Sequence, residues 1–189
     1  MFSAEIRPFL FDLWMCRYDT GFKLAGKLFS GRLVALMAAD ILLGDERRWQ
    51  WLNADGTASF FDGRTPRMML LSRLELDELI EPCCQSSVIY PCLDMYVFKS
   101  PLHAGVRLDL FDFQQNIWQA ENYATGLLRL GGYELYNPCF DLPLFHNHVS
   151  GQRPNQNENR CLRVHFGFLN VLFPSHSYPL SPPLSSQHP

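Results

Sequence analysis

The stretch GRLVALMAADILL, residues 31 to 43, decides which fold class the rest of the sequence has to fit. Its run from Leu33 to Ala38 is apolar without interruption, which is typical of a β-strand buried on both faces. Asp40 follows that run. Ligands of open α/β sheets gather at the carboxyl ends of strands, so Asp40 is a candidate site residue. The other interpretation is that Asp40 begins a turn or caps the next helix.

Helical and extended patterns alternate on both sides of this run. Apolar residues recur at 117, 120, 124, 127 and 128, the spacing of one helix face, and Gly131 and Gly132 follow as a helix stop. We also expect helices at 7–18 and 45–53, strands at 68–76, 93–102 and 133–136, and an extended piece at 140–148. This order predicts a single α/β domain whose mixed, mostly parallel sheet is flanked by helices.

Composition sets the expected extent of that domain. The chain has 189 residues, of which 47% are hydrophobic and 19% charged, values that favour one folded unit with a substantial core. We expect the domain to cover residues 1–173. The Pro/Ser-rich remainder, 174–189, lacks the apolar residues that a packed segment needs and is predicted to be a disordered tail.

Charge and hydropathy exclude several classes of protein. The formal net charge is −3 and no basic block is present, which disfavours nucleic-acid binding. No run approaches the roughly 18 apolar residues of a membrane span, and the first residues do not form a signal peptide. The sequence does not indicate a cellular compartment. Six irregularly spaced cysteines predict buried free thiols rather than a zinc site or a disulfide set.

The stretch ELYNPCFDLPLFHNHVSGQR, residues 134 to 153, gathers polar residues at an expected strand end. His146 and His148 are two residues apart, so on a strand they point to the same face and could share one metal ion. They could equally cap exposed carbonyl groups or face solvent. Ser150 and Arg153 complete the cluster.

Five stretches between residues 7 and 153 together resemble glycosyltransferases with a nucleotide-diphospho-sugar transferase (GT-A-like) fold. They are RPFLFDLW, GRLVALMAADILL, MLLSRLE, LDMYVFKSPL and AENYATGLLRLGGYELYNPCFDLPLFHNHVSGQR, in that order. Members of this group show Asn-x-Asp-Ile after a buried strand, Leu-Ser-Arg at the end of the next strand, and a closing His-x-His-x-Ser-x-x-Arg. This sequence departs from the pattern at Ala38, where the group has Asn, and at Tyr96, where Trp is usual. The likeness also implies that the first βα unit of such a domain is missing here.

The resemblance implies a nucleotide-sugar donor, a glycan or protein acceptor and a Mn²⁺ or Mg²⁺ ion. Its residue roles fall into three sets. Metal ligands would be Asp40 and His148, and the catalytic carboxylates would be Asp94 and Glu121. Substrate-binding residues would be Arg73, Asn122, His146, Ser150 and Arg153.

Simpler interpretations of these residues stand beside the functional ones. Arg73 could pair only with Glu75 or Asp77, and Glu121 could be a first-turn acid that faces the helix dipole. Three functions therefore remain open: a metal-assisted glycosyltransferase, a catalytically inactive remnant or interaction domain of the same fold, and a metal hydrolase that uses the histidine pair.

Overall fold

The structure is a computed structural model and describes residues 17–38, 41–44, 60–75, 93–115, 120–139 and 141–146. The elements are helix α1 (Tyr18–Leu28), strands β1 (Leu33–Met37), β2 (Ile41–Leu43), β3 (Arg67–Glu75) and β4 (Leu93–Lys99), the 3-10 helix η2 (Leu108–Phe111), helix α4 (Ala120–Leu130), and strands β5 (Glu134–Tyr136) and β6 (Leu144–His146). Neither α-helix in these ranges is long and apolar enough to cross a bilayer. The expected helices at 7–18 and 45–53 and the tail at 174–189 lie almost entirely outside the described residues.

The strands form one mixed sheet in the order β1-β4-β3-β6-β2, with β5 also pairing with β3. Strand β4 is antiparallel to both β1 and β3, and β2 is antiparallel to β6, whereas β5 and β6 are parallel to β3. The prediction of a mixed sheet in an α/β domain is confirmed. The expectation of mostly parallel pairing is wrong for the described strands, because β4 lies between two strands that run opposite to it.

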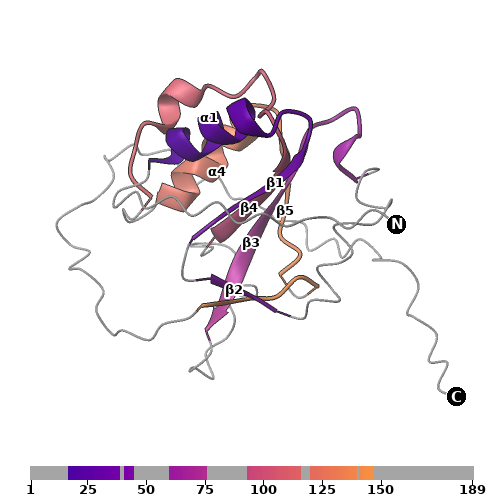
Figure 1. Cartoon of the computed structure of the whole chain (residues 1–189), viewed down its shortest axis with the longest axis vertical. Helices are drawn as coiled ribbons and strands as arrows, with labels where there is room; N and C mark the ends of the chain where they lie inside the picture. Colours follow the sequence, from indigo (N-terminus) through magenta and orange to yellow (C-terminus); the bar gives the residue numbers. More distant parts are fainter. Residues whose placement is uncertain are drawn as a thin grey trace, which may run out of the picture.

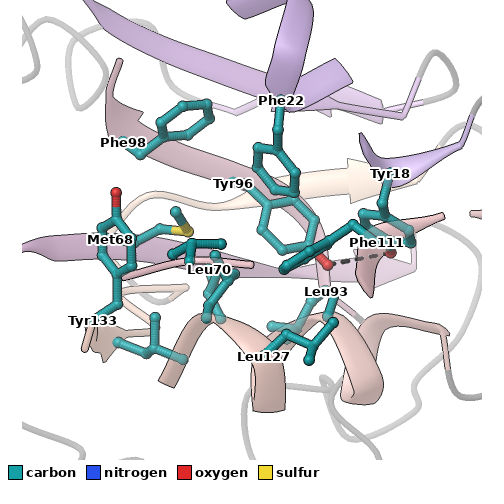
Figure 2. Packing of buried hydrophobic residues seen from close by; sticks show 14 of the residues in the cluster. Tyr18, Phe22, Met68, Leu70, Leu93, Tyr96, Phe98, Phe111, Leu127 and Tyr133 are labelled. Carbon is teal, nitrogen blue, oxygen red and sulfur yellow. Dashed lines mark hydrogen bonds between the residues drawn. The ribbon is translucent and has the colours of Figure 1, made fainter. Parts of the chain in front are cut away.

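Both α-helices lie on the same side of the sheet (Figure 1). They cover one face with an aromatic-rich core, in which Tyr18 and Phe22 of α1 contact Tyr96, Phe98 and Phe111 edge-on at 5.5–5.8 Å between ring centroids. Figure 2 shows this cluster. Burying each large apolar side chain contributes roughly 1.5–3 kcal/mol, so this layer is a main source of stability.

The opposite face of the sheet carries a second, smaller core. Alternate residues of β3 and β4 point to it, as the two-residue period of a strand requires. Its buried members are Ile41, Phe60, Phe61, Met69, Leu71, Met95, Val97, Leu142 and Leu144. The central strands are therefore buried on both faces, which explains the continuous apolar sequences of β3 and β4.

Strand β1 differs from its prediction. It is the end strand of the described sheet, and its burial alternates, with Leu33, Ala35 and Met37 exposed. The inward-facing Val34 and Leu36 pack against the aromatic-rich core. An apolar run alone does not distinguish an edge strand from a central one, so the prediction of burial on both faces was wrong.

Helix α4 ends as its glycines predict. The N–H of Gly132 donates to the carbonyl of Arg129, the N–H of Tyr133 donates to the carbonyl of Leu128, and Gly132 has a φ of 94°. This is a Schellman motif, whose left-handed residue is usually glycine because a Cβ is strained there. The motif turns the chain directly into β5.

Cys139 is buried and disulfide-bonded, which corrects the expectation of a free thiol at this position. Its partner lies outside the described residues. Irregular spacing along the sequence carries no information on which cysteines meet in space.

Candidate active site

The candidate site begins with an irregularity in strand β4. Leu71 of β3 pairs with Met95, but the next residue, Ser72, pairs with Leu93, so Asp94 is the extra residue of a β-bulge. The other neighbouring strand remains in register there, because the N–H of Ala38 donates to the carbonyl of Asp94 at 3.1 Å. Bulges redirect a side chain out of the regular alternation and are frequent beside active sites.

Asp94 forms an ion pair with Arg73 of β3. The Arg73 Nη1 donates to the Asp94 Oδ1 at 2.9 Å, and the two side chains are only 16% and 9% exposed. At this burial the charge-assisted hydrogen bond is shielded from salt and water. Arg73 thus has a partner that its simpler interpretation, a pair with Glu75 or Asp77, did not include; Asp77 and the side chain of Glu75 lie outside the described residues.

Glu121 lies in the first turn of α4, close enough to interact electrostatically with both members of the pair. Burial raises the pKa of Glu121 from 4.5 to about 7; a backbone hydrogen bond at Glu121 opposes this rise, as does Arg73, while Asp94 adds to it. The helix holds the residue in place because Ala120, Ala124 and Leu128 are completely buried beneath it. The carboxyl group therefore titrates near neutral pH in a partly buried environment.

Two tyrosines contribute to the same neighbourhood. The Tyr96 hydroxyl of β4 donates to the Tyr18 hydroxyl of α1 at 3.2 Å, the contact that Figure 2 marks with a dashed line. Burial raises the pKa of Tyr96 well above its usual value, and the Tyr18 hydroxyl and the carboxyl groups of Glu121 and Asp94 act in the same direction. Tyr96 thus stays neutral, within electrostatic range of Glu121 and Asp94.

Asn137, the residue directly after β5, hydrogen-bonds to Ser72 in the second half of β3. Strand β5 pairs with β3 only as far as Met69, and β6 begins to pair at Arg73, which leaves Ser72 between the two ladders. The Asn137 side chain fills this gap: its Oδ1 accepts from the Ser72 N–H at 3.2 Å, and its Nδ2 donates to the Ser72 Oγ at 2.8 Å. The sequence predicted a strand at 133–136 but no role for Asn137, the residue that follows it.

The remaining predicted residues are placed unevenly. Asn122 follows Glu121 on α4, is partly buried, and makes no side-chain hydrogen bond with another described residue. The backbone of His146 belongs to β6 and pairs with Ile41 of β2 and Glu75 of β3. Asp40, His148, Ser150 and Arg153 lie outside the described residues.

The structure thus brings three predicted residues, Arg73, Asp94 and Glu121, into one cluster. Their elements are far apart along the chain and meet because β3, the bulged β4 and the first turn of α4 adjoin. Among the described residues no group of three or more His, Cys, Asp and Glu side chains could hold a metal ion. The Arg73–Asp94–Glu121 cluster can accept and release a proton near pH 7 beside a fixed ion pair.

Comparisons of this chain with known protein families, with curated proteins and with solved structures found no match. The assignment of a function therefore depends on the geometry of the site and on the sequence resemblance.

Proposed function

We propose that this chain is a GT-A-like domain that transfers a sugar, with the help of a metal ion, from a nucleotide-sugar donor to a hydroxyl group of a glycan or protein acceptor. The observation that carries the proposal is the position of Glu121, with a pKa near 7, beside the Arg73–Asp94 ion pair. These three residues are ones for which the sequence resemblance implied functional roles. A carboxyl group with a pKa near neutrality suits proton transfer.

Glu121 is the proposed general base. The acceptor oxygen attacks the anomeric carbon of the donor sugar while its proton moves to a Glu121 carboxylate oxygen. The bond between the anomeric carbon and the diphosphate oxygen breaks, and the nucleoside diphosphate leaves with the electron pair. Asp94 is less suited to this role because Arg73 already neutralises its charge at 2.9 Å.

Arg73 and Asp94 are the proposed positioning pair. Their charges adjust the affinity of Glu121 for a proton, which burial raises most: Asp94 raises the pKa of Glu121 further and Arg73 lowers it. Because Arg73 is engaged with Asp94, Arg153 is the better proposed contact for the donor phosphates. Asn122, His146 and Ser150 are proposed to hydrogen-bond the substrates.

Asp40 and His148 are the proposed ligands of Mn²⁺ or Mg²⁺. Carboxylate oxygen and imidazole nitrogen suit Mn²⁺, and such an ion stabilises the charge of a diphosphate leaving group. The pairing of Ile41 with His146 supports the proposal, because it joins the residue after Asp40 to a residue two positions before His148.

Calorimetric titration with UDP and GDP, with and without Mn²⁺, tests the donor side of this proposal. We expect Mn²⁺-dependent binding of one nucleotide that Asp40→Ala abolishes and that the exposed-site control Asp109→Ala retains. No binding of either nucleotide would instead favour the inactive remnant. Metal uptake without nucleotide preference would favour the hydrolase.

Turnover tests the base. With the nucleotide sugar that this titration selects, Glu121→Gln should reduce turnover by about 10²- to 10⁴-fold and leave nucleotide affinity unchanged, because the substitution removes only the proton acceptor. Unchanged turnover would exclude Glu121 as the base.

A further inference from the structure

A second site lies at the opposite end of the central strands. A cavity of about 440 Å³ opens where β3 begins and β4 ends, and its lining includes Phe61, Arg64, Arg67, Lys99 and Tyr133. Along β3 it is about 20 Å from Arg73, at roughly 3.3 Å per residue. The proposed active site therefore does not account for this cavity, which has the size of a small-molecule site.

The charged side chains that line the cavity are all basic. Arg64, Arg67 and Lys99 line it together with His103, and no carboxylate among the described residues does so. Arg67 is paired with Glu134, and Lys99 with Asp62. The side chains of the Lys99–Asp62 pair are 49% and 48% exposed, so an incoming anion can replace Asp62 at little cost.

A neutral donor adds to these cations. The Tyr133 hydroxyl accepts a hydrogen bond from the His103 backbone N–H at 2.9 Å. No described residue accepts the proton of this hydroxyl. Figure 2 shows this hydroxyl directed away from Leu127, at the rim of the aromatic-rich core. The ring of Phe61 supplies an apolar wall.

We propose that this cavity binds a small phosphorylated organic molecule. Arg64 and Lys99 hold the phosphate, which Tyr133 reaches with its hydroxyl proton, and the apolar part of the ligand packs against Phe61. Arginine and lysine both suit phosphate, and the mixed apolar and basic lining matches a ligand with both characters.

Phenyl phosphate is the test ligand, with inorganic phosphate and phenol as comparisons, in NMR titrations of the full chain. We expect phenyl phosphate to bind more tightly than either comparison and to shift the amide resonances of residues 64, 99 and 133. Arg64→Gln and Lys99→Gln should each weaken binding about tenfold, as the loss of a charge-assisted hydrogen bond does.

Two control variants test whether binding depends on this cavity rather than on net charge or on the proposed active site. Lys23→Gln removes one positive charge from α1 outside the cavity and should leave the affinity unchanged. Glu121→Gln should do the same, so the two sites can fail independently. Equal affinity of Arg64→Gln and Lys23→Gln, equal binding of inorganic phosphate, or no binding of phenyl phosphate would each overturn the proposal.

Discussion

At the scale of single residues, the charge on Glu121 carries a cost to stability. The folded chain keeps the Glu121 proton up to about pH 7, while the unfolded chain loses it near pH 4.5. The unfolded state therefore binds fewer protons over this window, and stability falls as pH rises through it and is constant above it. A side chain retained at such a cost is typical of functional sites.

Replacing Glu121 with glutamine should remove that cost. We expect Glu121→Gln to raise the free energy of unfolding at pH 8 by on the order of 2 kcal/mol and to change it little at pH 4. Urea denaturation of both proteins at the two pH values measures the difference. A substitution that destabilises the fold equally at both pH values would contradict the raised pKa.

Breaking the Arg73–Asp94 pair should lower the free energy of unfolding, the opposite of the effect expected for Glu121→Gln. Arg73→Gln leaves the Asp94 carboxylate in a poorly solvated position, and we expect it to lower the free energy of unfolding at pH 7 by about 2–3 kcal/mol. The double variant with Asp94→Asn should recover part of this loss. Arg107→Gln breaks an exposed pair with Asp109, whose side chains are 69% and 59% exposed, and should change stability far less. Equal losses for Arg73→Gln and Arg107→Gln would contradict the burial of the site pair.

At the scale of secondary-structure elements, Asn137 joins two ladders of the sheet. Its amide group supplies the partners that neither β5 nor β6 offers to Ser72. We expect Asn137→Ala to lower the free energy of unfolding by about 1–3 kcal/mol, because it leaves a backbone N–H of a buried residue without an acceptor. Ser72→Ala, which removes only the hydroxyl contact, should cost less. The reverse order would show that the backbone bond is not the important one.

The sequence predicted some elements well for physical reasons. Helix α4 and strands β3 and β4 were predicted because their apolar spacing is periodic or continuous over most of their length. Helix α1 was not predicted. Gly21 and Gly26 lower its intrinsic propensity, and its stability comes from packing: a Cβ at Gly21 would come within 2.9 Å of Leu36 on β1. Tertiary contact of this kind is not visible in the sequence.

The candidate site also has features that the sequence shows and features that depend on tertiary contact. Residue types and motif order identified Arg73, Asp94 and Glu121, but not how they meet. Arg73 pairs with Asp94, 21 positions away, a contact that the sequence did not indicate. The bulge at Asp94 and the role of Asn137 depend on strand register, which single-sequence patterns do not determine.

At the scale of the whole molecule, the sheet has two covered faces in its centre and an exposed β1 at one end. Met37 and Met95 test this arrangement, because they face each other across β1 and β4 with 38% and 2% exposure. Met95→Ala should cost about 2–5 kcal/mol of unfolding free energy and Met37→Ala less than about 1 kcal/mol. Similar losses of unfolding free energy for the two variants would mean that Met37 is buried, and would contradict the exposure of β1.

The central claim is that the fold sets one carboxyl group to exchange a proton near neutral pH. Titration of the Glu121 side-chain ¹³C resonance by NMR, assigned with Glu121→Gln, measures this most directly. The account predicts a pKa of about 7, which rises further in Arg73→Gln because the nearby positive charge is removed. A value near 4.5 that does not respond to Arg73→Gln would contradict it.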